Sequence, residues 1–133
     1  MVAFPLLLIA FAIYNMVAFL TPGVAWTDRV FGVPMPSGVE WAVSAGDLLI
    51  AFALFLLFFE VLKAARNTAR SLFDHLLSTV IFIGALVEFL LVKQAATSTF
   101  AILLLISLVD VLGGWSVAVR TARRDFSIDP SQP

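Results

Sequence analysis

Residues 98–119 read STFAILLLISLVDVLGGWSVAV, and this apolar stretch decides the class of fold. About 20 apolar residues are needed to cross a bilayer as a helix, and the stretch meets that length with one charged residue, Asp110. Blocks of similar character lie at about 2–20, 40–62 and 74–93. In hydrocarbon the backbone polar groups of a segment must bond within that segment, so each block predicts a membrane-spanning helix. The expected fold is therefore all-α, an integral membrane four-helix bundle.

The composition indicates a single membrane domain over residues 1–133. Hydrophobic residues make up 62% of the chain and charged residues 13%, whereas a soluble domain is about half apolar and about a quarter charged. A net charge of −1 gives no reason to expect nucleic acid as a partner. The chain has no cysteine and one histidine, His75. We therefore expect no metal site and no cofactor, and since no catalytic pattern is present we expect no enzymatic activity.

The basic residues fall unevenly between the two sides of the predicted spans. Six follow the second and fourth blocks, and two lie on the opposite side, Arg29 and Lys93. Because cytoplasmic segments are enriched in Lys and Arg, both termini are predicted to be cytoplasmic, with a tail at 120–133. The six residues are also expected to contact anionic lipids of the bilayer; they are Lys63, Arg66, Arg70, Arg120, Arg123 and Arg124.

The segment between the first two blocks is predicted to be an external loop, because it is rich in Gly and Pro. Trp26, Phe31 and Trp41 favour a position against the membrane interface, where aromatic rings are enriched. A lid over a cavity among the helices is the alternative. Ser37 followed three residues later by Glu40 is typical of a helix N-terminus, and it predicts that the second helix begins here.

Asp110 lies near the midplane of the fourth block, where an ionisable side chain costs about 2.5–3.5 kcal/mol on insertion scales. Residues three and four positions away on a helix share a face, and those near Asp110 include Ser107, Gly113 and Gly114. Small residues let membrane helices approach one another closely. This face therefore predicts a helix contact around Asp110.

Glu88, Asp47 and Asn15 lie in the outer parts of the third, second and first blocks, and Gly84 shares the face of Glu88. If the four helices form one bundle, these polar groups are expected to meet in a pocket open to the outside, with Asp110 at its floor. Carboxyl groups that are desolvated close together resist ionisation. Three alternatives follow: the carboxyl groups are protonated and bond the helices together, they bind protons or cations, or a partner supplies the positive charge.

This chain resembles uncharacterised small four-helix inner-membrane proteins of bacteria in a pattern that covers most of its length: MPSGVEW, GD, FFEVLKAAR, DHLLS, VEFLLV and LVDVLGGWSV. The resemblance implies the same architecture and location, but no activity. The small multidrug transporters carry an essential carboxylate in their first span, whereas the first span here has only Asn15.

We therefore expect a small accessory or structural protein that associates with itself or with a larger membrane complex. The alternative is a proton- or cation-coupled small-molecule carrier that works as a homo-oligomer through Asp110, Glu88 and Asp47.

Overall fold

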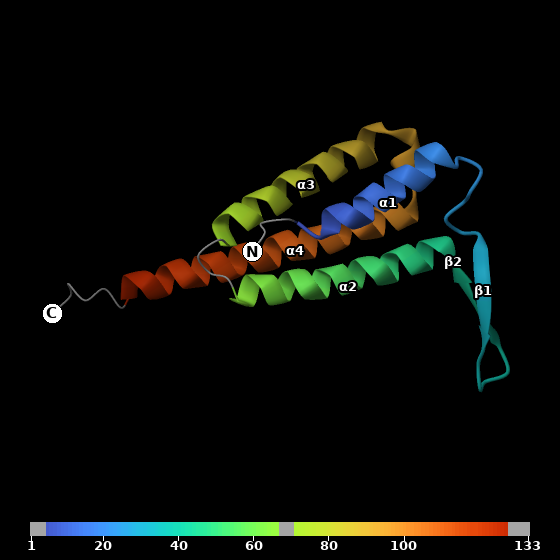
Figure 1. Ribbon diagram of the computed structural model, residues 1–133, viewed down its shortest axis with the longest axis horizontal. Coiled ribbons are helices and arrows are strands. Elements are labelled where there is room, and N and C mark those ends of the chain that lie inside the picture. Colours follow the sequence, from blue (N-terminus) through green and yellow to red (C-terminus); the bar gives the residue numbers. More distant parts are fainter. Residues whose placement is uncertain (1–4, 67–70, 128–133) are drawn as a thin grey trace.

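The computed structural model describes residues 5–66 and 71–127, and it describes side chains for 5–62 and 73–116. Within these ranges the chain forms four α-helices, a short 3₁₀ helix and a two-stranded antiparallel sheet (Figure 1). In chain order they are α1 (Leu7–Leu20), β1 (Arg29–Pro34), β2 (Glu40–Ser44), α2 (Ala45–Arg66), α3 (Ser71–Leu91), η1 (Lys93–Ala95) and α4 (Ser98–Ser127).

Three of these helices contain segments that are long and apolar enough to cross a membrane. The segments are Ala45–Leu62 in α2, Phe73–Leu91 in α3 and Ser98–Ser116 in α4. The first block was predicted to span as well, but α1 has 14 residues. At about 1.5 Å per residue it is shorter than the hydrocarbon core of about 30 Å. The described residues therefore contain three candidate membrane spans and one shorter apolar helix.

Pro5 explains where α1 starts. A proline has no N–H to donate and is tolerated only in the first turn of a helix. The carbonyl of Pro5 accepts the N–H of Leu8 at 3.1 Å, and the carbonyl of Leu6 accepts the N–H of Ile9 at 3.0 Å. These turns lead directly into the helix at Leu7.

α4 lies at the centre of the helices, in contact with α1, α2 and α3 (Figure 1). Gly46 at the start of α2 lies against Thr99 at the start of α4, and these two helices run parallel. Gly114 of α4 lies against His75 near the start of α3, and that pair runs antiparallel. We call the end that carries the β-strands and η1 the hairpin end, and the end where α2 stops and α3 starts the tail end.

The core at the hairpin end is built on Tyr14 of α1, whose side chain is fully buried. Its ring stacks on Trp26 with centroids 4.8 Å apart and meets Phe100 edge-on at 4.9 Å. Its hydroxyl donates to the carbonyl oxygen of Gln94 at 2.7 Å and lies 2.7 Å from Oγ1 of Thr97. Tyr14 therefore joins α1 to two other parts of the chain: the segment between α1 and β1, through Trp26, and the connection between α3 and α4, through Gln94 and Thr97.

The expectation of an all-α chain is corrected by the β-hairpin. Ser37 and Glu40 do not begin a helix: Gly38 occupies a turn with φ of 93°, and Glu40 pairs with Arg29 across the strands at 2.8 Å. The second helix begins five residues later than predicted, at Ala45. A reciprocal pair of bonds caps it there, since Asp47 Oδ2 accepts the N–H of Ser44 at 3.0 Å and Ser44 Oγ accepts the N–H of Asp47 at 3.1 Å.

The fourth span was predicted over 98–119, followed by a tail at 120–133. The candidate span covers Ser98–Ser116, α4 itself continues to Ser127, and 128–133 lie outside the described residues. The third helix, expected over 74–93, occupies Ser71–Leu91.

Replacing Tyr14 with Phe keeps the ring and removes the hydroxyl. We expect the free energy of unfolding to fall by about 1–2 kcal/mol, because the Gln94 carbonyl and the Thr97 hydroxyl lose a buried partner. Unfolding by sodium dodecyl sulfate in mixed micelles measures this. The control is Phe19→Leu on an exposed part of α1, expected to change stability by less than about 0.5 kcal/mol. An unchanged midpoint for Tyr14→Phe would contradict the anchoring role of the hydroxyl.

Candidate functional site

An open groove of about 350 Å³ runs between α1 and α3, and we call it the lateral groove. It brings together two of the polar residues predicted from the sequence, because Nδ2 of Asn15 lies 3.4 Å from Oε1 of Glu88. Asn15 also donates to the carbonyl of Phe11 at 3.0 Å. The groove is lined by Leu8, Phe11, Ala12, Asn15, Val80, Ile81, Gly84, Ala85 and Glu88.

Small residues leave space in the lateral groove. Ala12, Gly84 and Ala85 are among its lining residues, and a Cβ added at Gly84 would have no atom within 4 Å. Gly84 is exposed, whereas Glu88 and Asn15 are half-buried. The lateral groove is therefore a shallow apolar depression on the side of the molecule with one amide and one carboxyl group in its wall.

Asp47 does not line this groove. Its carboxylate caps the first turn of α2 through the backbone of Ser44, and the residue is exposed at the hairpin end. Carboxylates are favoured in the first turn of a helix, where they bond free N–H groups and face the positive end of the helix dipole. The contacts of Asp47 are therefore those of a helix cap.

Asp110 lies at a different depth from Glu88. Because Gly114 of α4 meets His75 of α3 in an antiparallel pair, Asp110 is level with about Thr79. Glu88 is nine residues further along α3, about 13 Å toward the hairpin end at 1.5 Å per residue. Asp110 is half-buried, and it belongs with the polar residues near the tail end rather than with the Asn15–Glu88 pair.

Those residues form a group that we call the tail-side polar cluster: Glu60, His75 and Ser78, all buried. The backbone N–H of Leu6 donates to Oε2 of Glu60, which ties the start of α1 to α2. The burial of Glu60 and His75 was not predicted from the sequence.

His75 is the most unusual member of the cluster. Its ring is 5% exposed, and Nε2 has no hydrogen-bond partner among the described residues. The carboxyl groups of Asp74 and Glu60 are both within electrostatic reach of the imidazole. Because a buried polar atom without a partner is rare and costly, His75 stands out among the polar side chains of the described residues.

Hydrogen bonds hold the His75 backbone and the neighbouring helices in place. Thr79 Oγ1 donates to the His75 carbonyl at 2.7 Å, and Trp115 Nε1 of α4 donates to Thr79 Oγ1 at 2.8 Å. The imidazole fills the space beside Gly114 that a side chain would need. The contact between α3 and α4 therefore depends on glycine at this position.

The small residues predicted as packing sites separate into two kinds. Ser107 and Gly114 are buried between helices, whereas Gly113 and Gly84 are exposed and face open space. Of the six basic residues, Arg70 lies outside the described residues. The other five are described only by their backbone and lie toward the tail end, Lys63 and Arg66 in the last turn of α2 and Arg120, Arg123 and Arg124 near the end of α4.

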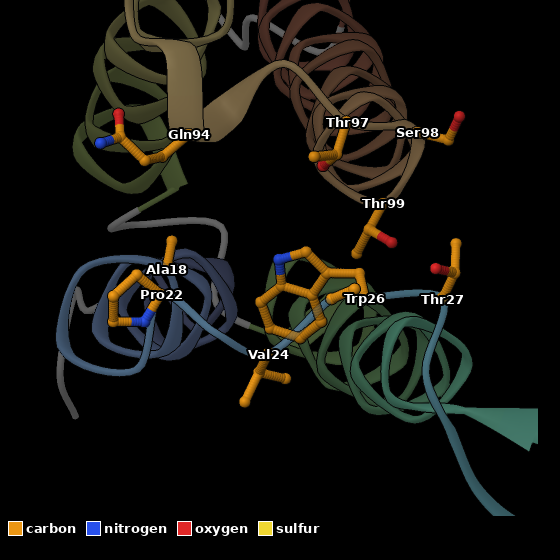
Figure 2. Close-up of a pocket in the computed structure, with 10 residues that line it drawn as sticks. Ala18, Pro22, Val24, Trp26, Thr27, Gln94, Thr97, Ser98 and Thr99 are labelled. Carbon is orange, nitrogen blue, oxygen red and sulfur yellow. The ribbon is translucent and has the colours of Figure 1, made fainter.

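A recess of about 360 Å³ lies at the hairpin end, between the segment that follows α1 and the start of α4. Figure 2 shows the Trp26 indole in its middle, with Thr97 and Thr99 on one side and Val24 on the other. Its side chains are hydroxyl, amide or apolar, with no charged group. Because Trp26 stacks on Tyr14, this residue packs within the molecule, unlike Phe31 and Trp41, which are exposed on the β-hairpin.

No group of three or more His, Cys, Asp or Glu residues in the described ranges is arranged to hold a metal ion. No protein-family model, curated protein or solved structure matches the chain. What the fold itself defines is a small, mostly helical protein with three candidate membrane spans and two separate polar groups at different depths.

Gly114→Ala tests the contact between α3 and α4. A Cβ at this position would overlap the His75 ring, so we expect a loss of about 1–3 kcal/mol in the free energy of unfolding. Gly113→Ala is the matched control, because its Cβ would point into open space and alanine is the better helix former. Equal stability of the two variants in detergent unfolding would contradict this helix contact.

Proposed function

We propose that this chain is a small integral membrane protein, a four-helix bundle, that acts as an accessory or structural subunit and associates with itself or with a larger membrane complex. The lateral groove is the observation that carries the proposal. It combines a half-buried carboxyl group, an amide and three small residues on the side of the helices.

The physical argument rests on what such a groove would meet in a bilayer. An ionisable side chain facing lipid is unfavourable, by about 2.5–3.5 kcal/mol at the centre of the bilayer. A transmembrane helix packed into the groove would cover Glu88 and Asn15 and could offer them hydrogen bonds. The open space at Gly84 would let the backbone of that helix approach closely, which is how membrane helices gain packing energy.

We further propose that both termini are cytoplasmic and that the membrane is the bacterial inner membrane. The orientation is inferred from six basic residues, and the five of them that the structure describes lie toward the tail end of α2 and α4. The other two basic residues, Arg29 and Lys93, lie at the hairpin end. The excess of basic residues on cytoplasmic segments supports that orientation. Besides the lipid bilayer, the expected partner is a second copy or another membrane protein, not nucleic acid, and we assign no catalysis and no cofactor.

Gly84→Leu tests the association. A leucine should fill the lateral groove without disturbing the helices, because nothing lies within 4 Å of the added Cβ. We expect the wild-type chain to appear as an oligomer or complex in native mass spectrometry after mild extraction from its own membrane, and the variant to appear as a monomer. The unfolding midpoint of each variant confirms that the fold is intact.

Gly113→Leu is the control, since this glycine is also exposed and also faces open space, but on α4. It should leave the association unchanged. A wild-type chain that is strictly monomeric would rule out the proposal. Loss of the complex at Gly113→Leu alone would move the contact away from the lateral groove.

A proton- or cation-coupled carrier that acts as a homo-oligomer is the second candidate function. The unpartnered, buried Nε2 of His75 beside Glu60 favours it, because such a nitrogen is suited to receive a proton in transit. Of the carboxylates expected to handle the ion, Asp110 is nearest in depth to this cluster, Glu88 lies further toward the hairpin end, and Asp47 has the contacts of a cap.

Asp110→Asn separates the two functions. The amide keeps the shape of the side chain and its capacity for hydrogen bonds but cannot ionise. If the chain is a carrier, the variant should assemble normally and lose ion-coupled flux in reconstituted vesicles, measured with a pH-sensitive dye inside the vesicle. Flux equal to that of the wild type would exclude Asp110 from ion coupling.

A further inference from the structure

The β-hairpin has two chemically different faces. Val33 pairs with Trp41 and Phe31 pairs with Val43, while Gly32 pairs with Ala42 on the next position along. Because successive side chains of a strand point to opposite sides, the first four residues share one face. Met35 and Val39, joined by the Met35 N–H to Val39 carbonyl bond of 3.0 Å, continue the same alternation. We call this side, which consists of Phe31, Val33, Met35, Val39, Trp41 and Val43, the apolar face.

The opposite face, which we call the polar face, carries the charged residues of the hairpin; it consists of Arg29, Gly32, Pro34, Glu40, Ala42 and Ser44. Arg29 and Glu40 form an ion pair of 2.8 Å there, and it lies over Gly32, filling the space that a side chain would take. The irregularity in the strand register between Arg29 and Phe31 is what brings Arg29 to this face, because one extra residue in a strand reverses the side on which the next residue points. Both partners of the ion pair are more than half exposed.

Most of the apolar face is exposed: Val43, where the hairpin joins the helices, is buried, Val33 is half-buried, and the other four side chains are exposed. Val43, next to α2, is 3% exposed, whereas Phe31 is 46% and Trp41 53% exposed. Met35 and Val39 at the far end of the hairpin are exposed as well. An isolated two-stranded hairpin is at best marginally stable in water, so this apolar face needs a cover that the described part of the chain does not provide.

The position of the hairpin identifies the cover. β2 leads directly into α2, whose candidate span begins at Ala45. The hairpin lies at the end of the helices, runs transverse to their axes and extends away from them past α2 (Figure 1). If the helices cross a bilayer, the β-hairpin leaves the end of the α2 span transverse to the helix axes, and it therefore runs along the membrane surface. Tryptophan is enriched at this interface, where an apolar ring can sit among headgroups.

We infer that the β-hairpin lies on the surface of the bilayer, with the apolar face against lipid and the Arg29–Glu40 ion pair toward water. The ligand of this surface is the interfacial layer of the membrane itself. This inference requires that the helices span a bilayer, but it does not depend on the lateral groove or on any partner protein.

Single-cysteine variants test the two faces, because the chain has no cysteine of its own. A nitroxide spin label is attached at Phe31→Cys on the apolar face and at Ala42→Cys on the polar face, in vesicles of phosphatidylcholine and phosphatidylglycerol. Power saturation then compares collisions with oxygen, which concentrates in lipid, and with a water-soluble nickel chelate. We expect oxygen to dominate at position 31 and nickel to dominate at position 42. Val39→Cys is a second reporter for the apolar face in case the first variant fails to fold.

Two results would overturn the inference. If nickel dominates at positions 31, 39 and 42 alike, the hairpin stands in water. If neither reagent reaches the labels at 31 and 39, protein rather than lipid covers the apolar face. A label at Leu105→Cys, an exposed position in the middle of the α4 span, reports separately whether the helices are inserted. If they are, oxygen should dominate at 105 whatever the labels on the hairpin show.

Discussion

α4 approaches α2 closely at one glycine and α3 closely at another. These two contacts set how far the three helices are shifted along one another, and the rest of the structure depends on that register. Gly46 of α2 lies against Thr99, and its N–H donates to the Trp26 carbonyl at 2.8 Å. Gly114 lies against His75 of α3. These contacts fix which residues of α2, α3 and α4 are level with one another, and so they place Asp110 nearer to His75 than to Glu88. They also fix where α2 begins, and with it the place from which the hairpin leaves the helices.

Local sequence was sufficient for the helices and insufficient for one boundary. Blocks 74–93 and 98–119 became helices because their length and apolar character leave a backbone in hydrocarbon no alternative. The Ser37–Glu40 spacing was misleading because a glycine at 38 favours a turn, and the true cap, Ser44–Asp47, has the same spacing seven residues later. The hairpin strands were missed because Gly and Pro interrupt their alternation, and because a two-stranded ribbon depends on its surroundings more than on its propensity.

The sequence gives the position of each polar residue along its helix, and so its depth in the membrane. It does not give which helices are neighbours, and the candidate sites could be predicted only from depth. Depth along the chain correctly allowed Asn15 and Glu88 to meet, since both lie in the parts of their helices nearer to the hairpin end. It could not show that Asp47 would be used as a cap, because that depends on where the helix starts. It also gave no sign that His75 would be buried. The signal for His75 is Gly114, thirty-nine residues away in the chain, and its meaning appears only when α3 and α4 are paired.

The hairpin and the helix register together order the polar groups by their distance from the membrane surface. If the hairpin rests at the interface, Ala45 marks that surface, and Glu88, level with about Leu48 of α2, lies about 5 Å below it. Asp110, level with about Leu57, lies about 18 Å below, close to the middle of a core of about 30 Å. The bilayer penalises a charge most at its centre. Asp110 then lies where the bilayer penalises a charge most, whereas Glu88 lies near the headgroups, so the two carboxyl groups stand at separate depths.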